Sequence, residues 1–357
     1  MIIGQTPPPF GGQAINIEKI ILTLRKNQVN HRFIRLHFSD QLNDMGRFNI
    51  TKAWRLLTTF SKIIFYLITY QPHIIYYPPA GPTRNAIYRD MILLLPIRLL
   101  QRKLVFHFHA GGLSDIYHSF SPLLQSIYRY VYYHAAHAIC LSQRGTKEPE
   151  ALKAKQIHII PSGVEDMRRK ISPLQQTKFI VLFAGLCSES KGIFDFIATI
   201  RKCHVANPAI TGHVLGKVFG EKEEKAIIAA CQEGILIYEG VQTGETKKEI
   251  FESAHVFLFP SFFESESFPT VILEAFSASL PVIATNWRGI PDQVTNGVNG
   301  YLADIHDTNK MAACILSLAV DPHLYEQLAA NARRHFETKY TISTFEASIL
   351  SFFKTNA

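Results

Sequence analysis

A regular alternation of short apolar segments with helix-length segments is the feature that most constrains how this 357-residue chain can fold. The apolar segments are rich in Ile, Val, Phe and Tyr. In the first half of the chain they lie at 1–5, 32–38, 73–78, 103–109, 136–142 and 157–162. In the second half they lie at 179–185, 212–218, 235–240, 255–261, 280–286 and 300–304. Because a βαβα order needs parallel strands joined by helical crossovers, we predict an α/β protein whose helices cover its sheets.

The pattern restarts after residues 168–178, a charged stretch that contains a proline. We therefore predict two Rossmann-like, doubly wound domains, at 1–170 and 171–340. Residues 341–357 read as one amphipathic helix that packs back toward the N-terminal domain. In open α/β sheets, ligands bind at the carboxyl ends of the strands, so an interdomain cleft is the expected site.

Several protein classes are disfavoured by what the sequence lacks. No apolar segment reaches the ~18–20 residues that cross a bilayer. Residues 1–12 lack the charged start and apolar core of a signal peptide. The five cysteines are scattered without metal-binding spacing, so we expect free thiols in a cytoplasmic protein and no metal site.

The charge is divided unevenly along the chain. Residues 1–170 hold 22 Lys and Arg against 9 Asp and Glu, a net charge of +13, while residues 171–357 hold 15 against 20, a net charge of −5. A basic half favours an anionic partner: membrane lipid, a phosphorylated substrate or nucleic acid. No nucleic-acid-binding motif is recognised, and we expect no such partner.

Two stretches of the basic half, 54–70 and 88–103, mix basic with aromatic and aliphatic residues. Such segments can lie in a membrane interface with their basic side chains near lipid phosphates. Their basic residues are Arg55, Lys62, Arg89, Arg98, Arg102 and Lys103. We therefore expect a protein that docks on an anionic membrane surface.

Two motifs of the N-terminal half could carry chemistry. Gly11 and Gly12 follow the first strand and precede a helix, so a ligand could approach the backbone and the helix amides closely. The alternative is an ordinary glycine turn. His107 and His109 share one face of the fourth strand, and His109 lies at its carboxyl end. The alternatives are a core histidine or half of a metal pair, although no third ligand is near in sequence.

Two further motifs belong to the C-terminal half. Lys191 opens a helix after a strand and a polar loop, where it could neutralise a phosphate, although most lysines are simply solvated. Glu266 lies in a polar loop, and Glu274 lies in the apolar helix that follows Pro269. We predict that Glu274 accepts hydrogen bonds from a vicinal diol such as ribose, because a buried carboxylate needs partners. The alternative is a Glu274 that reaches solvent or pairs with an arginine.

These segments, in this order, resemble glycosyltransferase family 4, the retaining nucleotide-sugar glycosyltransferases of the GT-B fold. The stretch 266–274 resembles the family's E-x7-E motif, and 279–302 resembles the segment that follows it. Residues 159–165 resemble the strand before the interdomain linker. His109 and the glycine loop match the acceptor-domain histidine and the first glycine loop. The resemblance covers nearly the whole chain, and 264–302 is its most specific part.

The resemblance implies a retaining transferase that uses a nucleotide-diphosphate sugar and needs neither metal nor other cofactor. The implied catalytic residues are His109 and Glu266. The implied donor-binding residues are Gly11, Gly12, Lys191, Glu266, Phe268, Thr270 and Glu274. Lys191 would contact the diphosphate and Glu274 the ribose, while Glu266 and the loop amides would hold the sugar. The family's step is a front-face attack in which the leaving phosphate takes the acceptor proton.

Two positions depart from the family pattern. Leu186 stands where an arginine is usual, and Arg288 replaces the first glycine of a pair. Many family members act on lipid-linked glycans, so we expect a polyprenyl-diphosphate-linked acceptor in surface polysaccharide assembly, on the inner face of the membrane. The rival functions are a nucleotide-sugar epimerase and a non-catalytic ligand-binding protein.

Overall fold

The computed structural model divides the chain into two compact units, and each is described by itself. It describes residues 1–8, 11–37, 50–168 and 178–356. The N-terminal unit comprises Met1–Ser162 together with Phe345–Ala357, and the C-terminal unit comprises Gly163–Thr344. The units therefore divide between Ser162 and Gly163, earlier than the predicted division after residue 170. The predicted boundary segment, 168–178, lies largely outside the described residues.

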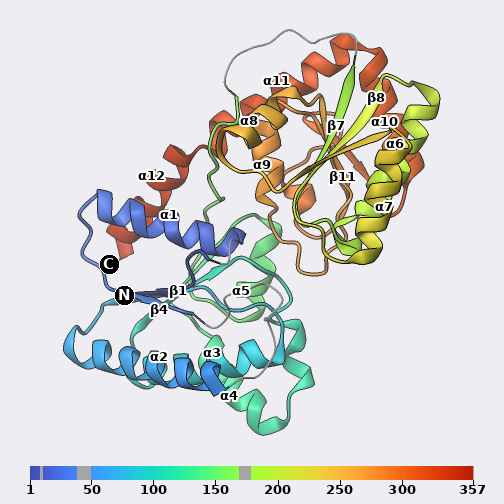
Figure 1. Cartoon of the computed structure of the whole chain (residues 1–357). Coiled ribbons are helices and arrows are strands. Elements are labelled where there is room, and N and C mark those ends of the chain that lie inside the picture. The colour runs from blue at the N-terminus through green and yellow to red at the C-terminus, as the bar shows by residue number, and fades with distance from the viewer. Residues whose placement is uncertain (9–10, 38–49, 169–177, 357) are drawn as a thin grey trace. The chain divides into compact units, whose positions relative to one another are not determined.

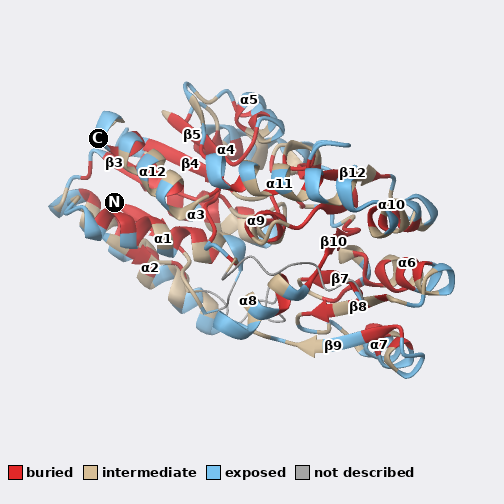
Figure 2. Ribbon diagram, turned by 90° about the horizontal axis from the view of Figure 1, so that it is seen from above, coloured by how far each residue is buried: buried red, intermediate tan, exposed pale blue. Residues whose placement is uncertain are grey.

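The N-terminal unit is built on a sheet of parallel strands in the order β2-β1-β3-β4-β5-β6. Its strands are β1 (Ile2–Gly4), β2 (Phe33–Arg35), β3 (Ile74–Tyr77), β4 (Lys103–Phe108), β5 (His137–Cys140) and β6 (Ile157–Ile159). The inner strands are buried on both faces (red in Figure 2), which explains why they read as continuous apolar runs.

Helices cover both faces of this sheet (Figure 1). They are α1 (Gly12–Lys26), α2 (Ile50–Thr69), α3 (Arg84–Leu99), α4 (Pro122–Tyr132), α5 (Lys147–Ala151) and α12 (Ile342–Asn356), with short 3-10 helices η2 (Asp115–Ser119) and η3 (Arg144–Thr146). One core lies between the sheet and α2, α3 and α4. A second core joins α1 to Phe345, Ile349, Phe352 and Phe353 of α12. The tail is thus the predicted helix, and it packs within the N-terminal unit.

The C-terminal unit repeats this arrangement with the strand order β12-β11-β10-β7-β8-β9, again entirely parallel. Its strands are β7 (Phe179–Ala184), β8 (Ile210–Leu215), β9 (Leu236–Gly240), β10 (Val256–Phe259), β11 (Val282–Thr285) and β12 (Gly300–Ala303). Each of the twelve predicted segments overlaps a strand, and β8 begins two residues before its segment. The α/β class and the parallel pairing are therefore confirmed.

Two helices of the C-terminal unit begin at a side-chain cap. The helices of this unit are α6 (Ile193–Ala206), α7 (Glu221–Gln232), α8 (Gly244–Ser253), α9 (Thr270–Ser277), α10 (Thr308–Val320) and α11 (Pro322–Lys339), with 3-10 helices η4 (Glu189–Lys191) and η5 (Ile290–Asp292). The side chain of Asp307 accepts a hydrogen bond from the backbone amide of Lys310 at the start of α10, and Asp321 caps α11 in the same way. No described helix combines the length and the hydropathy that a membrane span requires.

Candidate functional site

The loops that follow β7 and β10 meet at the carboxyl edge of the C-terminal sheet. The backbone amide of Phe262 donates to the carbonyl oxygen of Ser190 at 2.9 Å. Gly192 makes this contact possible, because its φ is +83° and a Cβ there would lie 2.1 Å from the carbonyl oxygen of Pro260. No larger residue fits without displacing that loop. The close approach carries the residues on either side of Gly192 toward the 260–266 loop.

Lys191 and Glu266 form an ion pair at this edge. The Nζ of Lys191 lies 2.6 Å from Oε2 of Glu266, and the same oxygen accepts a hydrogen bond from the Ser261 hydroxyl at 2.7 Å. The Lys191 ammonium also lies 4.5 Å from the ring centroid of Phe263, a cation–π contact. The side chains are 21% and 8% exposed, so both charges are held in a partly desolvated pair. An ammonium has three donors, so the pair leaves Lys191 able to bind a further anion.

Glu274 has a different partner from the one predicted. Its Oε1 accepts from Nζ of Lys247, on α8, at 2.7 Å. The partner is thus neither an arginine nor solvent, and the side chain is half-buried, not sealed in the core. Its Oε2 is shielded from solvent and has no hydrogen-bond partner among the described residues. An unpaired carboxylate oxygen of this kind costs free energy that a hydroxyl donor would offset.

The loop that carries Glu266 packs against the turn after β11. A Cβ on Gly289 would lie 1.6 Å from the carbonyl oxygen of Ser267, so only glycine fits there. The indole Nε1 of Trp287 donates to the carbonyl oxygen of Phe263 at 2.8 Å. Arg288 is exposed, and its guanidinium lies 5.2 Å from the ring centroid of Trp287. The structure therefore places this arginine over an indole ring.

Phe268 and Thr270 lie on either side of the α9 start. Phe268 is buried and packs edge-on against Tyr340, with ring centroids 5.9 Å apart. Pro269 is the N-cap residue, one position before the predicted first turn, and Thr270 is the first helical residue. The first amides of a helix have no intrahelical acceptor, so this end of α9 offers donors to an anion.

The glycine loop of the N-terminal unit is open. Gly11 is the N-cap of α1 and Gly12 its first residue. Both are exposed, and a Cβ at either would meet no atom within 4 Å. Gly11 has an extended backbone with φ −151°, so neither packing nor conformation here requires glycine. Space beside the amides of α1 remains for a ligand.

His109 directly follows β4 and stacks on His107, with ring centroids 4.1 Å apart. Nδ1 of His107 shares a hydrogen bond of 2.7 Å with the hydroxyl of Tyr76. Nε2 of each histidine is buried without a partner among the described residues. Burial lowers the pKa of His109 to about 3, and burial together with the neighbouring His109 lowers that of His107 well below its usual range. Both rings are therefore neutral near pH 7, and His109 can serve as a hydrogen-bonding group but not as a cation.

Two carboxylates fix the loops of this edge, and sequence reasoning missed both. Glu148 accepts from the amides of Gly112 at 2.5 Å and Ser114 at 3.0 Å, which anchors the loop after His109. Asp90 is fully buried and accepts from the Tyr77 hydroxyl at 2.6 Å and from the amide of Ala80 at 2.8 Å. The sequence did carry a signal for Asp90, because this carboxylate stands in an apolar helix, as Glu274 does. Glu148 had none, since the amides that donate to it lie far away in sequence.

Two of the basic residues predicted to face lipid make hydrogen bonds within the N-terminal unit. The guanidinium of Arg89 donates from Nη2 to Oδ1 of Asp90 at 2.7 Å. Arg98 donates from Nε to the carbonyl oxygen of Val131 at 2.8 Å, and also to that of Tyr133. The prediction was wrong for these two. Arg89 pairs with a buried carboxylate, and Arg98 donates to carbonyl oxygens that the end of α4 leaves unpaired.

The structure thus brings together Lys191 and Glu266 in direct contact, and places His109 at the carboxyl edge of its own sheet. Glu274 lies on the helix that follows the Glu266 loop. The sequence indicated neither Lys247, the partner of Glu274, nor Ser261, a partner of Glu266. Among the described residues there is no cluster of three or more His, Cys, Asp and Glu side chains that could hold a metal ion.

Two six-stranded parallel sheets, each covered by helices, define a protein of the GT-B fold class. Over 99% of each chain, the structure superposes on Anabaena HepE in complex with UDP, with a TM-score of 0.73 and 18% identity, a likeness that shows the fold.

The sequence comparisons add a family. Residues 164–335 match the family described as "Glycosyl transferases group 1". The chain is similar to D-inositol 3-phosphate glycosyltransferase of Paenarthrobacter aurescens, at 29% identity over 51% of this chain and 48% of the relative. It is also similar to the capsular polysaccharide biosynthesis glycosyltransferase CapM of Staphylococcus aureus, at 24% identity over 53% and 49%. The chain spans about half the length of the curated relatives it matches. The family match covers most of the C-terminal unit, which is less than half of the chain.

Proposed function

We propose that this protein is a retaining glycosyltransferase of family 4 that moves a sugar from a nucleotide-diphosphate sugar to a glycan acceptor. The observation that carries the proposal is the pair of glutamates at the carboxyl edge of the C-terminal sheet. Glu266 is held by Lys191 and Ser261, and one buried oxygen of Glu274 has no hydrogen-bond partner in the part of the chain that the structure describes. The family match over this unit and the UDP in HepE support a nucleotide-sugar donor.

The donor contacts follow from the chemistry of these side chains. Lys191 and the first amides of α9 neutralise the diphosphate, since an ammonium and a helix N-terminus both favour phosphate. Oε2 of Glu274 accepts from a ribose hydroxyl. Glu266 accepts from hydroxyls of the sugar, and Phe268 and Thr270 flank it with their backbone amides. Leu186 supplies no charge, so Lys191 carries more of the diphosphate neutralisation than it would beside an arginine.

The reaction breaks the bond between the anomeric carbon and the diphosphate oxygen. The acceptor hydroxyl forms the new bond on the same face, and the leaving phosphate oxygen takes its proton. The products are a glycoside of unchanged anomeric configuration and a nucleoside diphosphate. The protein's main task is to stabilise charge on the leaving group. His109 of the N-terminal unit, neutral near pH 7, positions the reacting sugar by hydrogen bonding, and Gly11 and Gly12 leave its approach open.

The acceptor in this proposal is a polyprenyl-diphosphate-linked glycan in surface polysaccharide assembly. Relatives whose names include colanic acid, capsular polysaccharide and amylovoran biosynthesis support that setting. A lipid-linked acceptor requires a protein at a membrane surface, and the net charge of +13 in residues 1–170 suits an anionic one. We therefore place the protein peripherally on the cytoplasmic face of the membrane.

A donor screen by thermal unfolding tests the proposal. A ligand at ~100 times its dissociation constant adds ~2.7 kcal/mol to the free energy of unfolding. We expect UDP or another nucleoside diphosphate, and one of its sugars, to raise the unfolding temperature. Incubation of that sugar donor without acceptor separates the rival enzyme, because an epimerase would isomerise the sugar. A protein that no nucleotide or nucleotide sugar stabilises would contradict the proposal.

A further inference from the structure

Gln293 is a buried glutamine whose side chain reaches the start of α9. It is the C-cap residue of η5, and it is 1% exposed. Its Nε2 donates to the carbonyl oxygen of Pro269, the N-cap residue of α9, at 3.1 Å. Since only the NH₂ end of the amide can donate to a carbonyl oxygen, this contact fixes the orientation of the side chain. The side chain is therefore committed to the helix that carries Glu274.

The other end of the Gln293 amide has no partner. Its Oε1 is shielded from solvent and accepts no hydrogen bond from any described residue. An orphaned carbonyl oxygen of this kind costs free energy at least comparable with what one buried hydrogen bond contributes. A methionine would fill the same space without that cost. Stability alone therefore does not favour glutamine here, and exceptions of this kind are typical of functional sites.

The carbonyl group of Pro269 determines where the amide of Thr270 points. Both belong to one planar trans peptide, in which the N–H lies opposite to the C=O. The carbonyl oxygen accepts from Gln293 and also from the amide of Ile272 at 3.2 Å, so both of its lone pairs are used. The peptide cannot rotate without breaking these bonds. The N–H of Thr270, the first residue of α9, is therefore held pointing away from Gln293, and it has no acceptor among the described residues.

A second buried amide holds Gln293 in place. Nδ2 of Asn299 donates to the backbone carbonyl oxygen of Gln293 at 3.0 Å and to Nδ1 of His335 at 2.8 Å. Burial lowers the pKa of His335 to about 4, so the ring is neutral near pH 7 and its Nδ1 can accept. The same ring stacks on Phe276 of α9, with centroids 5.7 Å apart. Contacts therefore run from the start of α9 to its last turn and fix the glutamine relative to the helix.

We propose that Gln293 is a positioning residue that aims the Thr270 amide at the donor diphosphate. It acts through the Pro269 peptide and does not touch the donor. The inference deepens the proposed function and rests on it, because the contact between α9 and the diphosphate belongs to that function. It adds the particular amide and the side chain that orients it. Since a hydrogen bond weakens when its donor is misaligned, loss of Gln293 weakens the binding of the diphosphate and the stabilisation of the leaving group.

Calorimetric measurement of UDP binding to Q293M tests this role. The variant should bind UDP roughly 10-fold more weakly than wild-type protein, a loss within the range of one charged hydrogen bond. Its midpoint of urea unfolding should stay the same or rise, because the orphaned oxygen is removed together with the donor. Uridine, which lacks the diphosphate, should bind both proteins alike. Unchanged UDP affinity, equal losses for UDP and uridine, or a fall of the urea midpoint that matches the lost affinity would overturn the positioning role.

A double-mutant cycle shows whether Gln293 acts through the Thr270 amide. T270P removes the N–H at a helix position that proline suits, and T270A, which keeps the N–H, is its reference. T270P should bind UDP more weakly than T270A. Adding Q293M to T270P should cause no further loss, because the amide that Gln293 orients is already gone. Losses that add in the double variant would place the action of Gln293 elsewhere and overturn the proposal.

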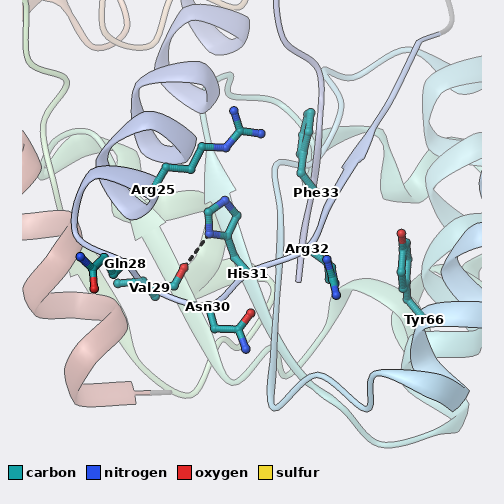
Figure 3. Close-up of a pocket in the computed structure, with 8 residues that line it drawn as sticks. All are labelled: Arg25, Gln28, Val29, Asn30, His31, Arg32, Phe33 and Tyr66. Carbon is teal, nitrogen blue, oxygen red and sulfur yellow. Dashed lines mark hydrogen bonds between the residues drawn. The ribbon is translucent and has the colours of Figure 1, made fainter.

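Two controls and the wild-type measurement complete the experiment. Gln125 of α4 donates from Nε2 to the carbonyl oxygen of Phe120 at 2.9 Å, so Q125M removes the same kind of hydrogen bond in the N-terminal unit. A pocket of about 550 Å³ in that unit is lined in part by Arg25 and Arg32, whose guanidinium groups point away from each other in Figure 3. Both Q125M and R25Q/R32Q should bind UDP like wild-type protein, and a loss equal to that of Q293M in either would overturn the assignment. If wild-type protein binds no nucleoside diphosphate, the proposed function fails and this inference with it, whereas wild-type binding that Q293M retains in full removes the inference alone.

Discussion

Replacement of Glu274 tests the donor assignment most directly. Its two carboxylate oxygens differ in the structure: Oε1 pairs with Lys247, and Oε2 is buried with no hydrogen-bond partner among the described residues. The pair is 24% and 15% exposed, between a surface and a buried ion pair, so Glu274→Ala should cost about 1–3 kcal/mol of unfolding free energy. If Oε2 accepts from ribose, the variant also loses a charged hydrogen bond of ~1.5–3 kcal/mol, or roughly 10- to 150-fold in donor affinity or turnover.

A nucleotide comparison separates these two effects. Donor affinity is measured by calorimetry with UDP and with deoxy-UDP, on wild-type protein, Glu274→Ala and Lys247→Met. Wild-type protein should bind the deoxy compound more weakly, Glu274→Ala should not distinguish the two, and Lys247→Met should lose stability while still distinguishing them. If folded Glu274→Ala binds donor and turns over like wild type, the reasoning is refuted, and Glu274 is only the partner of Lys247.

Three further outcomes are expected. Turnover should survive excess EDTA, because Lys191 and the α9 amides take the place of a cation on the diphosphate; loss that magnesium or manganese restores would count against this. Gly192→Ala should destabilise the protein by more than the ~1 kcal/mol of a left-handed alanine, owing to the clash with Pro260, whereas Gly234→Ala, also left-handed but open, should cost only that amount in denaturant melts. Acid should destabilise the fold: burial lowers the pKa of His109 to about 3, so the unfolded chain binds its proton first as pH falls below 6.5. Between pH 6.5 and about pH 5 this costs about 2 kcal/mol. His109→Asn should reduce that loss in urea titrations at each pH, and the exposed His323→Asn should not.

The sequence determined most of the fold for a physical reason. A strand of a parallel sheet is buried on both faces, so each one leaves a continuous apolar run that can be read locally. All twelve runs overlap strands, and the tail from Ile342 forms the expected helix. The boundary between the two units at Ser162 was harder to predict from the sequence. It depends on which unit each residue packs in, and composition does not show this.

The sequence also indicated which residues could form the site, but only the tertiary structure decided what they contact. Residues at the carboxyl ends of strands are predictable, since strand direction fixes the edge, and Lys191, Glu266 and His109 all lie there. The partners of these and other polar residues come from distant segments. Lys247 pairs with Glu274, Tyr76 bonds to His107 of the histidine pair, and a carbonyl oxygen of α4 accepts from Arg98. Contacts of this kind depend on side-chain directions and distances that no local pattern encodes.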